Sequence, residues 1–170
     1  MRLDDAKALF VEMVRDLYSA ETQLTLALPR VAVRVQSTSL RTGLENHLRE
    51  TETHVARLEA IAEELAFSPG GRVCIGMAGI LKEGDDAMGY GGDPRLVDAA
   101  IICACRKVEH YEMAAYHGLL SVVEAMGDLP NIRQQITATL REEEAAERTL
   151  SDAAARTGGH APAQSTPGMA

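Results

Sequence analysis

Residues 140–150 carry the sequence LREEEAAERTL, in which acidic residues interrupt a helical pattern of apolar ones. Leu140 and Leu150 belong to a stripe of apolar residues three or four positions apart, the spacing of a helix with one buried face. Glu143 and Glu147 fall on the same stripe, so their carboxylates are expected to point toward the core. The segment therefore predicts an amphipathic helix that carries negative charge into an apolar interior.

Four long segments of the chain share this period and predict four long helices. They cover about residues 4–35, 40–66, 93–126 and 131–156. Between residues 68 and 94 glycines are frequent, and one short helix is predicted at about 73–83. A connection of this length suits the crossover that lets the second and third long helices of a bundle run parallel. We predict an all-α four-helix bundle over residues 1–157, with a disordered tail over 158–170.

Each long helix also carries an acidic residue or a histidine on its buried stripe. The candidate metal ligands are Glu21, Glu50, His54, Glu109, Glu112, Glu143 and Glu147. A buried ionised carboxylate costs several kcal/mol, and neighbouring carboxylates raise one another's pKa values. Cations remove that conflict, and carboxylates with one or two imidazoles form the ligand sets of di-iron and di-manganese bundles. His47, two turns from His54, is a weaker candidate, and Glu142 is expected to face water or the rim.

The inward acids leave two other functions open. A single inward glutamate more often pairs with an arginine, and a lone core histidine is more often hydrogen-bonded than metal-bound. A non-catalytic helical scaffold is therefore one alternative, and iron sequestration in a closed assembly of many subunits is the other. Because all four helices break their stripe near mid-length, we expect a site for two iron or manganese ions. Its oxygen-rich ligands favour these metals over zinc or copper, and we expect it to react with oxygen or peroxide.

The composition of the chain argues against several other classes of function. Its 170 residues have a formal net charge of −8 and a pI near 5.1, which disfavours nucleic acid as a partner. A charged start and the lack of an apolar run of about 20 residues argue against a signal peptide and a membrane span, so a cytoplasmic protein is expected. The three cysteines form no C-x-x-C pair and are expected to pack as small hydrophobes. With no phosphate-binding loop and no G-x-S-x-G elbow, no catalytic residue or organic cofactor is predicted.

Four motifs, in order along the chain, resemble those of the YciF-like branch of ferritin-like stress-response proteins. They are LYSAETQL at 17–24, HLRETETHVARLE at 47–59, KVEHYEMAAY at 107–116 and TLREEEAAE at 139–147. The resemblance covers about residues 5–155 and implies a ferritin-like four-helix bundle, a homodimer, a di-metal centre and a role in bacterial stress responses. Two departures affect the implied ligands. Such bundles usually carry Glu-x-x-His on two helices, whereas this chain has Glu50 four residues before His54, and Glu147 where a second histidine would be expected.

Overall fold

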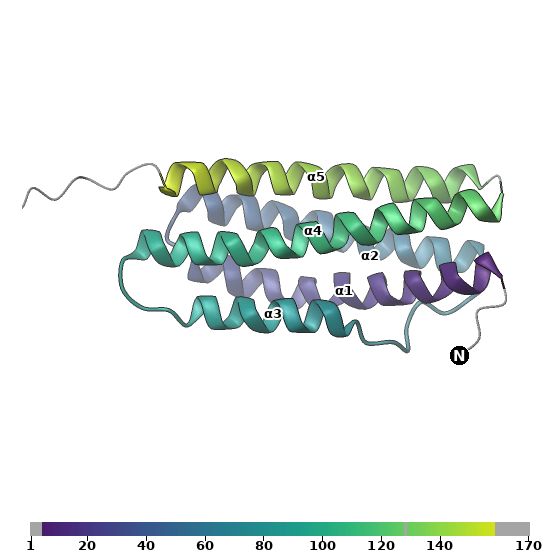
Figure 1. Cartoon of the computed structure of the whole chain (residues 1–170), viewed down its shortest axis with the longest axis horizontal. Coiled ribbons are helices and arrows are strands. Elements are labelled where there is room, and N and C mark those ends of the chain that lie inside the picture. The colour runs from purple at the N-terminus through teal and green to yellow at the C-terminus, as the bar shows by residue number, and fades with distance from the viewer. Residues whose placement is uncertain (1–4, 128, 159–170) are drawn as a thin grey trace, which may run out of the picture.

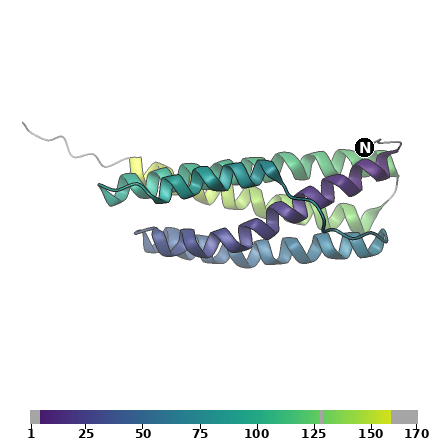
Figure 2. The same ribbon diagram turned by 90° about the horizontal axis from the view of Figure 1, so that it is seen from below.

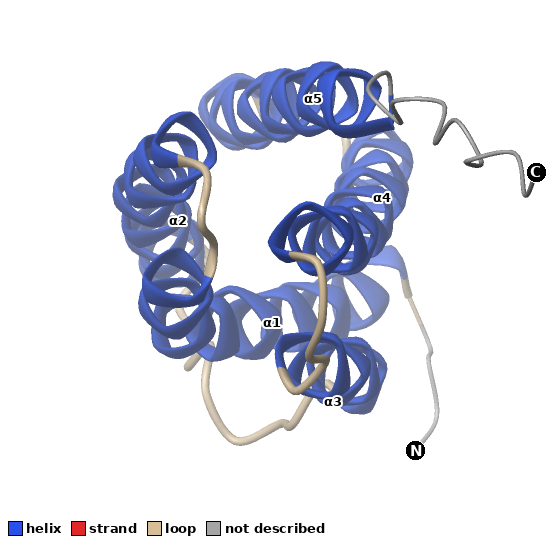
Figure 3. Ribbon diagram, turned by 90° about the vertical axis from the view of Figure 1, so that its left-hand side faces the viewer, coloured by secondary structure: helices blue, strands red, loops and turns tan. Residues whose placement is uncertain are grey.

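The computed structural model of the chain describes residues 5–127 and 129–158, and over these residues every regular element is a helix. The helices are α1 (Ala6–Arg34), α2 (Thr38–Glu64), α3 (Ile75–Met88), α4 (Pro94–Met126) and α5 (Pro130–Gly158). The long helices α1, α2, α4 and α5 surround a common interior, and α3 packs outside them against α1 and α4 (Figures 1 and 3). The predicted all-α bundle is confirmed. The predicted tail lies outside the described residues, apart from Gly158, which ends α5.

The connection between α2 and α4 is the predicted long crossover. Seen from below, it passes over α1 before entering α3, which then runs back along the bundle (Figure 2). As a result α2 and α4 run in the same direction, each antiparallel to its hairpin partner (Figure 1). One detail differs from prediction, because α3 extends five residues past Glu83. The first helix continues through Pro29 to Arg34, in agreement with the predicted span of about residues 4–35.

Side-chain caps define where helices begin. The Asp5 carboxylate accepts a hydrogen bond from the Ala8 amide at 2.7 Å, which satisfies a donor that the first turn of α1 leaves free. At the start of α4, Asp93 accepts from the Arg95 amide at 2.9 Å, and Pro94 occupies the first helical position, where its missing N–H costs nothing. These local signals fix where α1 and α4 begin, two of the helices that carry the buried acids.

Two apolar clusters occupy opposite ends of the bundle. One contains Leu24, Leu28, Leu44, Ile101, Val108 and Leu150; the other contains Phe10, Leu17, Leu58, Ile61, Leu119 and Ile136. The residues between them along each long helix include the buried acids and histidines, so the fold places a polar layer at mid-length between two apolar ones. No helix in the described part of the chain is long and apolar enough to cross a membrane.

The crossover is fastened to the bundle by a polar network around Cys74, the N-cap of α3. Its Sγ lies 2.8 Å from the Tyr111 hydroxyl, and that hydroxyl donates to Asp16 of α1 at 2.9 Å. Arg72 donates to the same Asp16 carboxylate at 2.9 Å. Cys74 is therefore buried in a hydrogen-bonded network rather than acting only as a small hydrophobe, and Cys103 is exposed, contrary to the prediction.

Candidate metal centre

The middle of the bundle contains a cluster of buried carboxylates and imidazoles to which all four long helices contribute. Its members are Glu21 of α1, His47 and His54 of α2, Glu109 and Glu112 of α4, and Glu143 of α5. None of these residues is more than 6% exposed. They form two groups that share Glu143, and we call these the His54 subsite and the His47 subsite.

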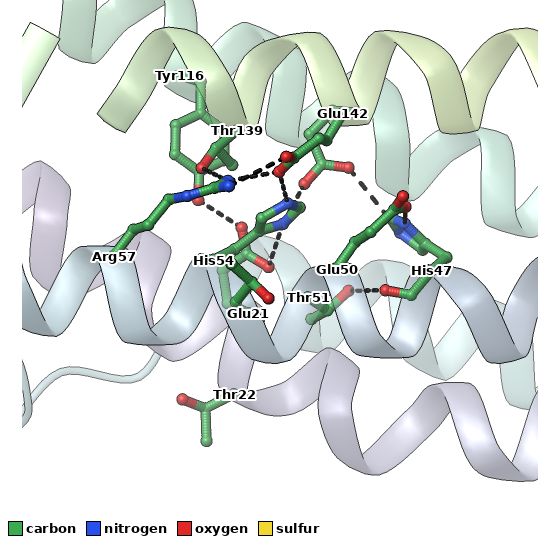
Figure 4. A network of polar contacts seen from close by, with 12 residues as sticks. Glu21, Thr22, His47, Glu50, Thr51, His54, Arg57, Tyr116, Thr139 and Glu142 are labelled. Carbon is green, nitrogen blue, oxygen red and sulfur yellow. Dashed lines mark hydrogen bonds and ion pairs between the residues drawn. The ribbon is translucent and has the colours of Figure 1, made fainter. Parts of the chain in front are cut away.

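The His54 subsite consists of Glu21, His54 and Glu143. His54 Nδ1 lies 2.8 Å from Glu143 Oε1. It also lies 3.5 Å from Glu21 Oε2 (Figure 4). One ligand atom from each residue falls within 4.8 Å of the others. Since metal–ligand bonds of about 2 Å put opposite ligands about 4 Å apart, this spread suits a single cation.

The His47 subsite consists of His47, Glu109, Glu112 and Glu143. His47 Nε2 lies 3.4 Å from Glu109 Oε1 and 3.9 Å from Glu143 Oε2. These four residues also offer ligand atoms within 4.8 Å of one another. Glu143 belongs to both groups, since its Oε1 approaches His54 and its Oε2 approaches His47, so this carboxylate could serve a cation in each subsite.

Many polar atoms of this cluster have no hydrogen-bond partner among the described residues. They are Glu21 Oε2, both ring nitrogens of His47, His54 Nδ1, Glu109 Oε2, and both carboxylate oxygens of Glu112 and of Glu143. The 2.8 Å approach of His54 to Glu143 is close but lacks hydrogen-bond geometry. Buried groups left unpaired in this way are costly. The atoms involved are carboxylate oxygens and imidazole nitrogens without a thiolate, so the residues present fit iron or manganese.

Burial and mutual repulsion shift the pKa values of the cluster. Burial raises the pKa values of Glu109 and Glu112 well above those of ordinary glutamates. It disfavours the charged imidazoles as well, but Glu109 beside His47 and Glu143 beside His54 outweigh it, raising the histidine pKa values to about 9 and about 10. For Glu143 burial is likewise outweighed, and the adjacent His54 lowers its pKa. The cluster therefore holds protons where no cation neutralises it.

His54 is held from outside the cluster by Glu142. Its Nε2 lies 2.9 Å from Glu142 Oε2, and Arg57 binds both oxygens of that carboxylate, one of them at 3.0 Å (Figure 4). Arg57 also donates to Thr139 at 3.0 Å and lowers the pKa of Glu142. A neutral His54 that donates its Nε2 proton to Glu142 turns the Nδ1 lone pair toward Glu21 and Glu143, the arrangement of carboxylate–histidine–metal triads.

Tyr116 is a second group that the sequence did not single out. It is almost fully buried on α4, and its hydroxyl donates a hydrogen bond to Glu21 Oε1. Burial and the negative charge of Glu21 raise its pKa well above that of an ordinary tyrosine, so it remains a neutral donor. Its position one turn after Glu112, on the same buried face, was a signal that could have identified it.

Five of the seven predicted ligands are brought together in the structure. They are Glu21, His54, Glu109, Glu112 and Glu143. His47, predicted as the weaker histidine, is a full member of the cluster. Two turns of α2 separate it from His54, but their ring centroids lie only 6.5 Å apart, within the span of a two-cation site.

The other two predicted ligands lie outside both subsites. The Glu50 side chain is 48% exposed, and its Oε2 is 3.6 Å from His47 Nδ1, so it lies at the rim. Glu147 is ion-paired with Arg106 of α4, with Nη2 and Oε1 2.6 Å apart. That arginine neutralises Glu147 one turn away from Glu143. Glu142, expected at the rim, is 33% exposed there and also contacts His54.

Comparison with known proteins places the chain in a family. The family model described as "Domain of unknown function (DUF892)" matches residues 5–161. The chain belongs to this family. Protein YciF of Escherichia coli strain K12 is 32% identical over 155 residues, which cover 91% of this chain and 93% of YciF.

Solved structures agree with this assignment. The crystal structure of the E. coli stress protein YciF superposes with a TM-score of 0.88 at 30% identity, covering 92% of this chain and 99% of that one. YcfI of Rhodopseudomonas palustris, for which a structural role has been suggested, gives a TM-score of 0.83 at 35% identity over 87% of this chain and 94% of its own. The predicted resemblance to YciF-like stress proteins is confirmed.

Proposed function

We propose that this YciF-like protein binds two iron or manganese ions at mid-bundle, bridged by Glu143. The observation that supports the proposal is the set of buried, unpartnered oxygens and nitrogens that converge there from four helices. The charges point the same way. The cluster contains four carboxylates and two imidazoles, so two protonated histidines would still leave two buried carboxylates to be neutralised.

The roles of the residues follow from their positions. Glu21 and His54 would hold one ion, and His47, Glu109 and Glu112 the other. A bound pair would supply Lewis-acid and redox chemistry toward oxygen or peroxide. Glu142 orients His54, Tyr116 holds a proton at its hydroxyl toward Glu21, and the two apolar clusters exclude water from either end.

A metal-free scaffold is the second candidate. It is favoured by the close approach of His54 to Glu143 and of His47 to Glu109, which as ion pairs would neutralise part of the charge. It does not account for Glu112, whose two buried oxygens have no partner among the described residues. Iron sequestration requires a closed shell of many subunits. We propose a homodimer instead, and a mass measurement in solution separates the two.

Metal content is the decisive experiment. Protein purified without chelator should contain close to two ions of iron or manganese per chain by elemental analysis. Replacing Glu143 or His54 with Ala should reduce this number to one or fewer. Glu144→Ala is the matched control, since Glu144 neighbours Glu143 but its side chain is 41% exposed. Well under one metal ion per chain, unchanged by either substitution, would support the scaffold.

A further inference from the structure

A pocket of about 200 Å³ opens between α2 and α5 and reaches the His47 subsite. His47 and Glu109 are the buried titratable residues of its lining, which also includes buried apolar residues such as Leu44 and Leu150, whereas Glu50 lines it at the exposed rim. None of the residues that line this pocket belongs to the His54 subsite. The two halves of the centre therefore differ in their access to solvent.

The two buried titratable residues of the lining carry polar atoms without a partner. Both ring nitrogens of His47, and Oε2 of Glu109, have no hydrogen-bond partner among the described residues. His47 is 6% exposed and Glu109 is 2% exposed, so water at the protein surface can supply few hydrogen bonds to their polar atoms. Unpartnered ligand atoms on residues that line a cavity large enough for several water molecules are the features of a binding site rather than of a packing defect.

Small side chains keep the pocket open. Its walls include Gly43 of α2 and Ala146 and Thr149 of α5. A Cβ atom built on Gly43 would lie 4.0 Å from Thr149 Cγ2, so an alanine would fit there and a longer side chain would extend into the gap. The width of this gap is thus set by side-chain size on two facing helices.

The His54 subsite is covered instead. His54 is fully buried, and Glu142 and Arg57 join α2 to α5 directly over it. On its other side, Tyr116 closes the space next to Glu21. An ion held there would have charged and aromatic side chains between itself and solvent.

From this asymmetry we infer that the α2–α5 pocket is the port of the centre, serving the His47 subsite. The cation at His47 exchanges with solvent and keeps a coordination position for a small oxygen- or nitrogen-donor ligand of the size of water, peroxide or azide. The cation at His54 is retained. This inference rests on the proposed function and assigns different roles to its two halves.

Cobalt release tests the inference. The protein is loaded with Co²⁺, whose visible absorption reports its coordination, and then mixed with excess EDTA. Release should occur in two phases of equal amplitude, the fast one at least tenfold faster. Azide should change the spectrum of one ion per chain. His47→Gln should abolish the fast phase and leave the slow one.

Two substitutions on opposite walls narrow the port. Gly43→Leu and Ala146→Leu should each slow the fast phase at least tenfold and suppress the azide response, with the slow phase and the final metal content unchanged. Ala155→Leu is the matched control, because Ala155 is an exposed residue of α5 that does not line the pocket. Circular dichroism verifies folding, and if a leucine variant fails to fold, the His47→Gln result decides.

Different failures have different meanings. A single release phase, a fast phase unchanged by both leucines, or loss of the slow phase in His47→Gln would overturn the port while leaving the metal centre in place. A protein that takes up no Co²⁺ would overturn the proposed function itself, and the port with it.

Discussion

His47 and His54 lie on the same face of α2, are both buried and both approach Glu143, yet their surroundings differ. His54 has its outer nitrogen 2.9 Å from Glu142, which Arg57 clamps. The ring nitrogens of His47 have no hydrogen-bond partner in the described part of the chain, and this residue lines an open pocket. The difference comes from α5, which places Glu142 next to the outer nitrogen of His54, whereas its Ala145 and Ala146 line the pocket beside His47. One helix can thus build a closed and an open half of a centre from identical side chains.

The largest expected effect is stabilisation of both halves by metal. At free Mn²⁺ about 100-fold above Kd, each ion adds about 2.7 kcal/mol, so two ions add about 5 kcal/mol. For a domain of this size the melting temperature should rise by about 10–20 °C and fall again with EDTA. In His47→Ala the rise should be about half as large. A shift below about 2 °C in the unmodified protein would contradict the two-ion centre.

The pH dependence of the metal-free protein should be the next largest effect. Folding raises the pKa of His47 from 6.5 to about 9 and that of His54 to about 10. Their contribution to stability is therefore complete below pH 6.5 and is lost as the pH rises through 9 and 10. The raised pKa values of Glu109 and Glu112 act in the same direction.

Thermal melts in EDTA should accordingly show a melting temperature at least about 5 °C lower at pH 9.5 than at pH 6.5. The metal-loaded protein should show the opposite trend from pH 5.5 to 7.5, because its ligands release protons when they bind cations. Equal slopes with and without metal would show that these groups do not exchange protons for cations.

Removal of Glu142 should affect one half only. Glu142→Ala should weaken metal binding at the His54 subsite by about 10- to 100-fold, as losses of such outer partners usually do. Glu142→Gln, whose amide oxygen can still accept from Nε2, should recover part of the affinity, and Glu144→Ala should have no effect. Titration calorimetry resolves the two sites. An equal loss at both would contradict a specific role in positioning His54.

The smallest expected effect is that of the Tyr116 hydroxyl. Tyr116→Phe leaves Glu21 Oε1 without its donor and should cost about 1–3 kcal/mol in the free energy of unfolding of the metal-free protein. Tyr18→Phe is the matched control, since Tyr18 donates to Glu59 at 3.0 Å on the exposed surface, and it should cost less than about 0.5 kcal/mol. Urea denaturation measures both. Similar losses of unfolding free energy in the two variants would show that the hydrogen bond from Tyr116 to Glu21 contributes no more than an exposed one.

Most of the fold was predictable because helix formation is locally encoded. Apolar spacing identified every long helix, and the predicted start of the third long helix at about residue 93 lies one residue from Pro94, where α4 begins. The same spacing identified Glu21, Glu112 and Glu143 as inward, since a residue on a buried stripe has no other direction to face. The length of the connection also predicted the crossover, although α3 proved longer than expected.

The sequence by itself determined the helices, the inward acids and the family. Only the tertiary structure decided which acids remain unpaired. Glu143 and Glu147 lie one turn apart on one stripe, but Arg106 reaches Glu147 and no arginine among the described residues reaches Glu143. Likewise, packing of α2 against α5 brings His47 close to Glu143 and places Glu142 against His54. Periodicity fixes the direction of a side chain, whereas its charge balance depends on neighbours that only packing brings together.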